Sequence, residues 1–236
     1  RQLPNMTSFA KSIAAERPEE IALRDPRQAL TWLDVDNVLN RAANAIRLAD
    51  TGPDLRIAVF AENGVETALA NLGGLIGGAS VVPINFHLTA EEVAYILSDS
   101  GARLVFIGPE TAERGLEAAA LAGIDQVIGW RCEIAGLQSW DEWLAASSPE
   151  EPDTSIPPRP NLLYTSGTTG RPKGTHLPPT MFAGGDTVEA HLQNLKLNPL
   201  AALGPHLVVG PMYHTGPLSG ARLLAAGAPS VILTKF

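Results

Sequence analysis

The segment from Leu162 to Gly174 reads Leu-Leu-Tyr-Thr-Ser-Gly-Thr-Thr-Gly-Arg-Pro-Lys-Gly. The apolar run at its start predicts the end of a buried strand. Hydroxyl residues interleaved with glycines follow that run: Thr165, Ser166, Gly167, Thr168, Thr169 and Gly170. Glycine lets the backbone approach a ligand closely, so successive N–H groups and hydroxyls can donate into one concavity, and Lys173 adds a positive charge. No carboxylate lies in the segment, so the pattern favours a loop that binds a polyphosphate.

A segment rich in glycine, serine and threonine is also typical of a flexible linker. The apolar run before this segment and the stiff Pro172-Lys173-Gly174 at its end favour a binding loop instead. The segment differs from the P-loop of common NTPases, in which Ser or Thr follows the lysine. Here Gly174 follows Lys173, and Pro172 stands where a helix would begin.

Residues 165–174 resemble the phosphate-loop signature of the adenylate-forming superfamily. That superfamily contains acyl- and aryl-CoA synthetases, luciferase-like enzymes and the adenylation domains of peptide synthetases. The chain is most similar to the N-terminal part of fatty-acid–CoA ligases. The resemblance implies that the phosphates of ATP are bound by Thr165, Ser166, Gly167, Thr168, Thr169, Gly170 and Lys173. It also implies that Thr169 lies near Mg²⁺, and no catalytic residue is assigned.

A second motif, Pro211 to Pro217, follows an apolar strand and contains His214. A histidine beside a strand is usually only a packed or surface residue. In acyl-CoA synthetases, however, a Pro-x-x-His segment lies here and its histidine borders the acyl and pantetheine channel, so the resemblance implies this role for His214. Amino-acid-activating relatives carry an aspartate in this region. The motif contains no carboxylate, which favours an uncharged acyl group. We assign no role to His176, because Pro178 and Pro179 beside it depart from the family's pattern.

The composition of the 236 residues fits a globular protein with a sizeable core, since 45% are hydrophobic and 18% charged. The net charge of −8 gives no basic field for nucleic acid or an anionic membrane. The single cysteine, Cys132, cannot form an internal disulfide, which favours a reducing compartment and a cytoplasmic location. We interpret Cys132 as structural. Residues 68–90 lack Asp, Glu, Lys and Arg, but Asn71, Ser80 and Pro83 interrupt them, so no transmembrane segment is predicted and no signal peptide is recognised.

Apolar strands alternate with amphipathic helices along the chain. Strands are predicted over 21–24, 29–32, 57–61, 81–84, 104–107, 126–129, 206–210 and 231–234. Helices are predicted over 8–17, 65–76, 110–122 and 180–195, and also after Thr31, Thr89 and Ser139, with Gly101 ending one of them. This alternation predicts an α/β fold with largely parallel sheets covered by helices on both faces. We predict a first α/β subdomain over 1–146, a Pro-rich linker over 147–160, and the start of a second, incomplete subdomain over 161–236.

The resemblance therefore implies a parent enzyme that activates a fatty or other hydrophobic carboxylic acid with ATP and Mg²⁺ and transfers the acyl group to CoA as co-substrate. Its partners would be these small molecules, with no nucleic acid, and a homo-oligomer is compatible with the sequence. The family's adenine-, ribose- and Mg-binding residues and its C-terminal domain have no counterpart before Phe236. We therefore expect an N-terminal fragment that is inactive alone. Two alternatives stay open: an acyl-AMP ligase that loads a carrier protein, and a nucleotide-binding module without turnover.

Overall fold

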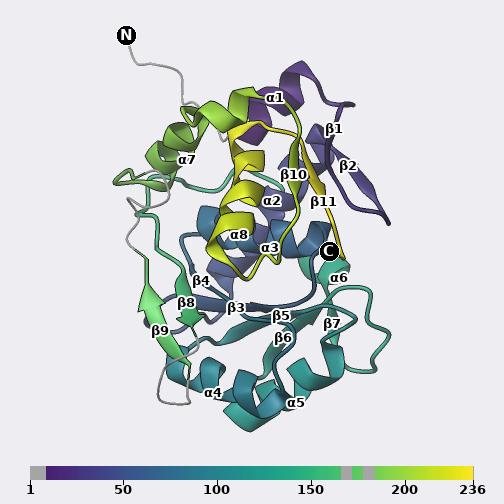
Figure 1. Cartoon of the computed structure of the whole chain (residues 1–236), viewed down its shortest axis with the longest axis vertical. Helices are drawn as coiled ribbons and strands as arrows, with labels where there is room; N and C mark the ends of the chain where they lie inside the picture. Colours follow the sequence, from purple (N-terminus) through teal and green to yellow (C-terminus); the bar gives the residue numbers. More distant parts are fainter. Residues whose placement is uncertain (1–8, 166–171, 178–183, 236) are drawn as a thin grey trace.

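The computed structural model describes residues 9–165, 172–177 and 184–235. Its largest sheet is parallel and has five strands. The strands are β3 (Arg56–Phe60), β4 (Ser80–Pro83), β5 (Leu104–Ile107), β6 (Gln126–Gly129) and β7 (Gln138–Ser139), in the order β4-β3-β5-β6-β7. Helices α2 (Trp32–Leu48), α3 (Val65–Ile76) and α6 (Trp140–Ala145) lie on one side, and α4 (Ala90–Ser100) and α5 (Ala112–Ala122) on the other (Figure 1).

Alternate residues of β3 enter different cores, as the two-residue period of a strand requires. Ile57 and Val59 pack with α2 and α3, whereas Ala58 and Phe60 pack with α4 and α5. All four side chains are buried, which explains why the strand is apolar throughout and not alternately polar. The predicted α/β fold with helices on both faces of a parallel sheet is confirmed.

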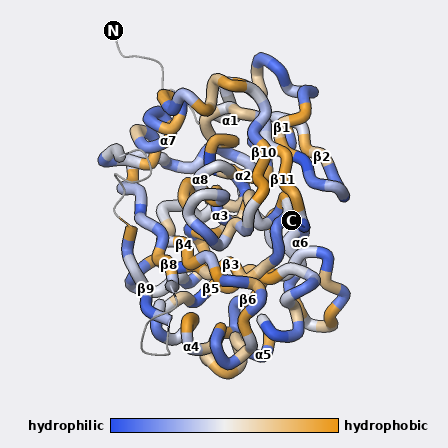
Figure 2. The backbone as a smooth tube through the Cα atoms, in the orientation of Figure 1, coloured by the Kyte–Doolittle hydropathy of each residue, from blue (hydrophilic) through white to orange (hydrophobic). Residues whose placement is uncertain are grey.

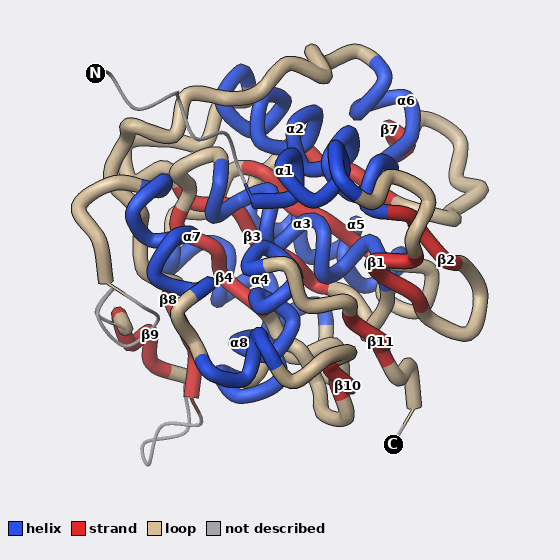
Figure 3. Tube along the Cα trace, turned by 90° about the horizontal axis from the view of Figure 1, so that it is seen from above, coloured by secondary structure: helices blue, strands red, loops and turns tan. Residues whose placement is uncertain are grey.

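Strands from both ends of the chain form a second sheet. Its strands are β1 (Ile21–Arg24), β2 (Ala29–Thr31), β10 (His206–Val208) and β11 (Ser230–Ile232), in the order β10-β11-β1-β2. β11 pairs in parallel with both β10 and β1, and β2 pairs antiparallel with β1. Seen from above, these four strands lie together on one side of the molecule (Figure 3), and β10 and β11 are largely hydrophobic (Figure 2). The helices α1 (Phe9–Glu16), α7 (Val188–Lys196) and α8 (Thr215–Arg222) and the 3₁₀ helices η2 (Pro199–Ala202) and η3 (Leu223–Ala226) complete this part.

The pairing of β1 with β11 crosses the predicted boundary between 1–146 and 161–236. The predicted linker, 147–160, runs along α2 and is held there by side chains one helical turn apart. Arg41 donates to the carbonyl of Ser147, Asn44 to those of Ser148 and Glu150, and Arg47 to that of Asp153. The division into subdomains 1–146 and 161–236 stays a prediction. The four-stranded sheet contains strands from both of these ranges.

Local signals in the sequence set the ends of several helices. Thr31 and Asp34 form a capping box at the start of α2, and Thr89 and Glu92 form another at the start of α4. Gly101 ends α4 with a φ of 70°, a left-handed conformation that glycine adopts without strain. These three predictions are confirmed. No helix in the described residues is long and apolar enough to span a bilayer.

The predicted buried strand before the phosphate loop is instead one arm of an exposed hairpin. β8 (Leu162–Thr165) pairs antiparallel with β9 (Lys173–His176), and these two strands form a small sheet of their own. Only Leu162 is buried in β8, and all four residues of β9 are exposed. The prediction of a buried strand is therefore wrong beyond Leu162, because the partner strand does not belong to a helix-covered sheet.

Candidate functional site

The two ends of the predicted phosphate loop are directly opposite each other. Thr165 ends β8, Lys173 begins β9, and the register pairs them. Directly opposed residues of an antiparallel pair point to the same face, so the hydroxyl and the ammonium group lie on one side of the hairpin, both on exposed residues. Ser166, Gly167, Thr168, Thr169 and Gly170, the other predicted phosphate-binding residues, lie outside the described residues, and so does the predicted Mg²⁺ contact of Thr169.

Side-chain contacts fix the hairpin to the five-stranded sheet. The hydroxyl of Tyr164 donates to Oδ2 of Asp99, at the end of α4, over 2.6 Å. Burial raises the pKa of the Tyr164 phenol, and the bond to the Asp99 carboxylate raises it further. Nε2 of His176 lies 3.3 Å from Nη2 of Arg56, the first residue of β3. The hairpin therefore contacts the amino end of β3.

A buried polar pair links the base of the hairpin to α8. Nη2 of Arg222, the last residue of α8, donates to Oδ1 of Asn161, immediately before β8, over 2.7 Å. Both residues are almost fully buried, with exposed fractions of 2% and 1%. Burial lowers the pKa of the Arg222 guanidinium to about 10. The sequence analysis missed this pair, and no local pattern indicates it, because its members lie far apart in the chain.

His214 is exposed and lies immediately before α8, which begins at Thr215. Its ring centroid is 4.4 Å from that of Tyr213, and the Tyr213 ring in turn meets Phe86 edge-on at 5.6 Å. Phe86 follows the end of β4. The segment before His214 is bound by Asn63, which follows the end of β3. His214 therefore lies among aromatic rings near the carboxyl ends of β3 and β4, where ligands of open α/β sheets commonly bind.

The two predicted motifs contact opposite ends of β3. Within the described part of the chain, no hydrogen bond, ion pair or ring contact joins Thr165 or Lys173 to His214. The structure thus brings together Thr165 and Lys173, and separately His214 with Tyr213 and Phe86. It does not bring the two groups into one contact network.

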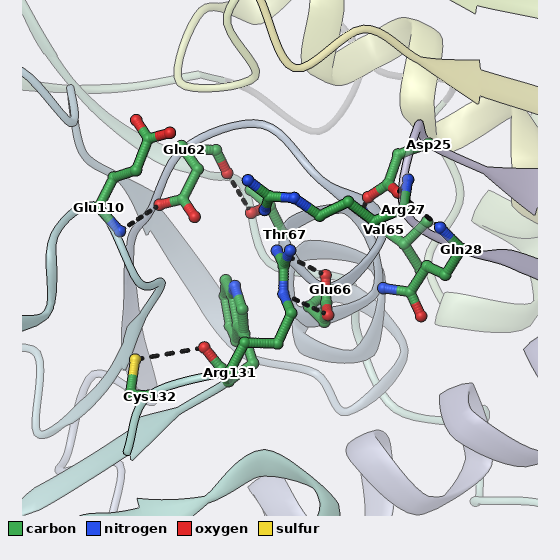
Figure 4. Close-up of polar contacts among 11 residues, drawn as sticks. Asp25, Arg27, Gln28, Glu62, Val65, Glu66, Thr67, Glu110, Arg131 and Cys132 are labelled. Atoms are coloured by element: carbon green, nitrogen blue, oxygen red, sulfur yellow. Dashed lines mark hydrogen bonds and ion pairs between the residues drawn. The ribbon is translucent and has the colours of Figure 1, made fainter. Parts of the chain in front are cut away.

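A further polar cluster lies at the carboxyl ends of the central strands (Figure 4). Arg131, after β6, forms an ion pair with Glu66 at the start of α3, with Nε 3.0 Å from Oε1. Burial raises the pKa of the Cys132 thiol, and the Glu62 carboxylate raises it further. A thiol with a raised pKa is a poor nucleophile, which supports the structural interpretation of Cys132. Among the described residues, no three His, Cys, Asp or Glu side chains are grouped so that they could hold a metal ion.

Residues 10–236 match the family described as AMP-binding enzyme. The chain belongs to the AMP-binding enzyme family. The resemblance to adenylate-forming enzymes is thereby confirmed. As a member of this family, the chain is 33% identical over 147 residues to the long-chain-fatty-acid–CoA ligase FadD13 of Mycobacterium tuberculosis. It is 29% identical over 161 residues to tyrocidine synthase 3 of Brevibacillus parabrevis.

The same architecture occurs in the inhibitor-bound crystal structure of the N-terminal domain of FACL13 from Mycobacterium tuberculosis, with a TM-score of 0.74 and 25% identity. The chain covers only part of each relative's length. The matches comprise 61% of this chain and 29% of FadD13, 68% of this chain and 2% of tyrocidine synthase 3, and 98% of this chain and 58% of the FACL13 chain.

Proposed function

We propose that this chain carries the triphosphate-binding loop and part of the acyl channel of an acyl-CoA synthetase. The observation that carries the proposal is the hairpin that places Thr165 opposite Lys173 at the two ends of the loop signature. The similarity to FadD13, a long-chain-fatty-acid–CoA ligase, supports a fatty acid as the substrate. The net charge of −8 and the single Cys132 support a cytoplasmic location without a nucleic-acid partner.

In the proposed first step, a carboxylate oxygen of the acid attacks the α-phosphorus of ATP. The bond between this phosphorus and the bridging oxygen breaks, so pyrophosphate leaves and an acyl-adenylate forms. The task of the protein is to orient the triphosphate and neutralise the charge of the leaving pyrophosphate. Lys173 supplies a positive charge and Thr165 a hydroxyl donor. Mg²⁺ would add further charge neutralisation near Thr169, which lies outside the described residues, so no step is assigned to it.

In the proposed second step, the thiol of CoA attacks the carbonyl carbon of the adenylate, AMP leaves, and the thiol proton passes to solvent. His214 would border the channel through which the acyl chain and the pantetheine arm approach. The aromatic rings of Tyr213 and Phe86 beside it and the absence of a carboxylate from residues 211–217 support an uncharged, hydrophobic acyl group.

A second candidate is an acyl-AMP ligase that passes the acyl group of its adenylate to a carrier protein. The similarity to tyrocidine synthase 3 supports this candidate. The two candidates share the first step and differ only in the acceptor. Supplying CoA or a carrier protein to the complete enzyme and identifying the thioester that forms therefore distinguishes between them.

The variant Lys173→Ala in the complete enzyme tests the proposal. One hydrogen bond to a charged group contributes about 1.5–3 kcal/mol, so the rate of ATP–pyrophosphate exchange should fall by about 10–150-fold. The melting temperature should not change, because Lys173 is exposed. Lys196→Ala, an exposed lysine at the end of α7, is the matched control. Exchange at the unmodified rate in Lys173→Ala would contradict the phosphate-binding role. ATP binding without any exchange in the unmodified enzyme would favour a nucleotide-binding module without turnover.

A further inference from the structure

Asn63 connects three segments that lie far apart in the sequence. It follows β3, its exposed fraction is 1%, and its side chain makes three hydrogen bonds. Nδ2 donates to the carbonyl oxygen of Gly210 over 2.9 Å and to that of Leu233 over 3.2 Å. Oδ1 accepts a hydrogen bond from the N–H of Met212 over 2.9 Å. The side-chain amide therefore uses both of its N–H groups and its oxygen on the backbone that follows β10 and β11.

These bonds fix the turn that leads to His214. Gly210 and Met212 flank Pro211, and the carbonyl of Pro211 accepts the N–H of His214 over 3.0 Å. The carbonyl of His214 then accepts the N–H of Leu218 in the first turn of α8. The Asn63 side chain thus holds the two residues that flank Pro211, and the backbone of Pro211 and Leu218 in turn bonds to that of His214.

Hydrogen bonds also fix the backbone on both sides of Asn63, which restricts the position of its side chain. The hydroxyl of Thr67 donates to the carbonyl of Glu62 over 2.6 Å, and Oδ2 of Asp25 accepts the N–H of Val65 over 3.1 Å (Figure 4). Asparagine suits this position because its amide offers two N–H donors and an acceptor oxygen. An ionised carboxylate has no donor, and a hydroxyl group has only one O–H donor. A buried amide with both functions satisfied fixes one arrangement of its partners.

We propose that Asn63 is a positioning residue that sets the location of His214 in the acyl and pantetheine channel. The inference rests on the proposed function, since it assigns Asn63 to the same site. Asn63 acts through the turn of residues 210–214 and touches no substrate. Its loss should displace His214 while leaving the phosphate-binding hairpin in place, because the hairpin contacts the opposite end of β3.

Asn71 provides a matched control. It is equally buried, with an exposed fraction of 1%, and among the described residues its Nδ2 donates to the carbonyl of Thr67 alone, one turn earlier in α3. Asn71→Ala therefore removes a buried amide of the same kind without touching residues 210–214.

The test compares Asn63→Ala with Asn71→Ala in the complete enzyme. In Asn63→Ala, the KM values for the carboxylic acid and for CoA should rise by at least about tenfold relative to Asn71→Ala, and the KM for ATP should stay within about twofold. The amide protons of Met212 and His214 should exchange faster in Asn63→Ala only. The combination of Asn63→Ala with His214→Ala should cost less than the sum of the single effects, because Asn63 acts through His214.

Equal changes of the three KM values in both asparagine variants, or additive effects with His214→Ala, would overturn the positioning role. If Asn63→Ala does not fold, Asn63→Asp serves instead, since its carboxyl oxygen can still accept the N–H of Met212 while the two donated bonds to Gly210 and Leu233 are lost. In Asn63→Asp, too, the KM values for the acid and CoA should rise while the KM for ATP stays within about twofold. Absence of pyrophosphate exchange in the unmodified enzyme would overturn the proposed function and the catalytic role of Asn63 with it. Normal exchange without the selective KM change would overturn the role of Asn63 alone.

Discussion

Glu62 has a buried carboxyl group at the end of β3, with an exposed fraction of 3%. Its Oε2 accepts the N–H of Glu110 over 3.3 Å. Burial raises the pKa of this carboxyl group above its ordinary value of 4.5, and the nearby Glu110 charge raises it further. A carboxyl group whose pKa is raised in the folded state stabilises the protein fully below its unfolded pKa, and that contribution is lost as the pH rises through the raised pKa.

The first prediction from this residue concerns Glu62→Gln. Glutamine does not ionise, so the variant should have a higher free energy of unfolding than the unmodified protein at pH 7. The difference should shrink as the pH falls from the raised pKa toward about 4.5, below which glutamate is protonated in both states. Urea unfolding at a series of pH values measures this difference. The exposed Glu117→Gln is the control and should show no such pH-dependent gain. Equal free energies for Glu62→Gln and the unmodified protein at every pH would contradict the prediction.

At the scale of elements, the bond between Tyr164 and Asp99 is a main side-chain attachment of the β8–β9 hairpin. Tyr164→Phe keeps the ring and removes the donor. We expect a loss of about 1 kcal/mol, because both groups are partly accessible to water, which weakens a bond to a charged acceptor. Amide protons of residues 162–165 and 173–176 should then exchange faster, while those of β3 and β5 do not change. Asp99→Asn keeps an acceptor and should have a smaller effect. Unchanged exchange in Tyr164→Phe would show that the hairpin is held by other contacts.

The sequence predicts those parts of the fold whose determinants lie within a few residues of each other. The capping boxes of α2 and α4 and the terminal Gly101 are such cases, because donor and acceptor belong to the same turn. The burial of β8 could not be predicted in this way, since an apolar run indicates burial but not which strand pairs with it. The loop signature assigns Thr165 and Lys173 to phosphate binding but does not predict that the two residues pair in a hairpin. Asn63 gives no local signal, because its partners Gly210 and Met212 come from the other end of the chain.

At the scale of the whole molecule, one hydrophobic core connects the two larger sheets. Leu23 of β1, Phe106 of β5 and Ile232 of β11 belong to the same cluster of buried side chains, together with Leu224 of η3. The shared core implies that both sheets lose their packing together, even though a Pro-rich segment separates the two predicted subdomains.

The prediction at this scale concerns Leu224→Ala. Leu224 is fully buried, so its truncation should lower the free energy of unfolding by about 2–5 kcal/mol. Tryptophan fluorescence, which reports on the four buried residues Trp32, Trp130, Trp140 and Trp143, should shift together with far-UV circular dichroism. Leu197→Ala, at a side chain that is 78% exposed, should change the free energy by no more than about 0.5 kcal/mol. Two separate transitions would instead favour independent folding on either side of residues 147–160.

The position of β1 between β2 and β11 also affects the protein while it is being made. A ribosome releases β1 early and β11 roughly 200 residues later, which takes about 10–40 s at a rate of about 5–20 residues per second. The five-stranded sheet can form during this interval, because all its strands precede residue 140. β1 cannot complete its pairing, and one edge of it stays open to any other extended segment. A chaperone that binds extended chains would therefore act between the emergence of β1 and that of β11.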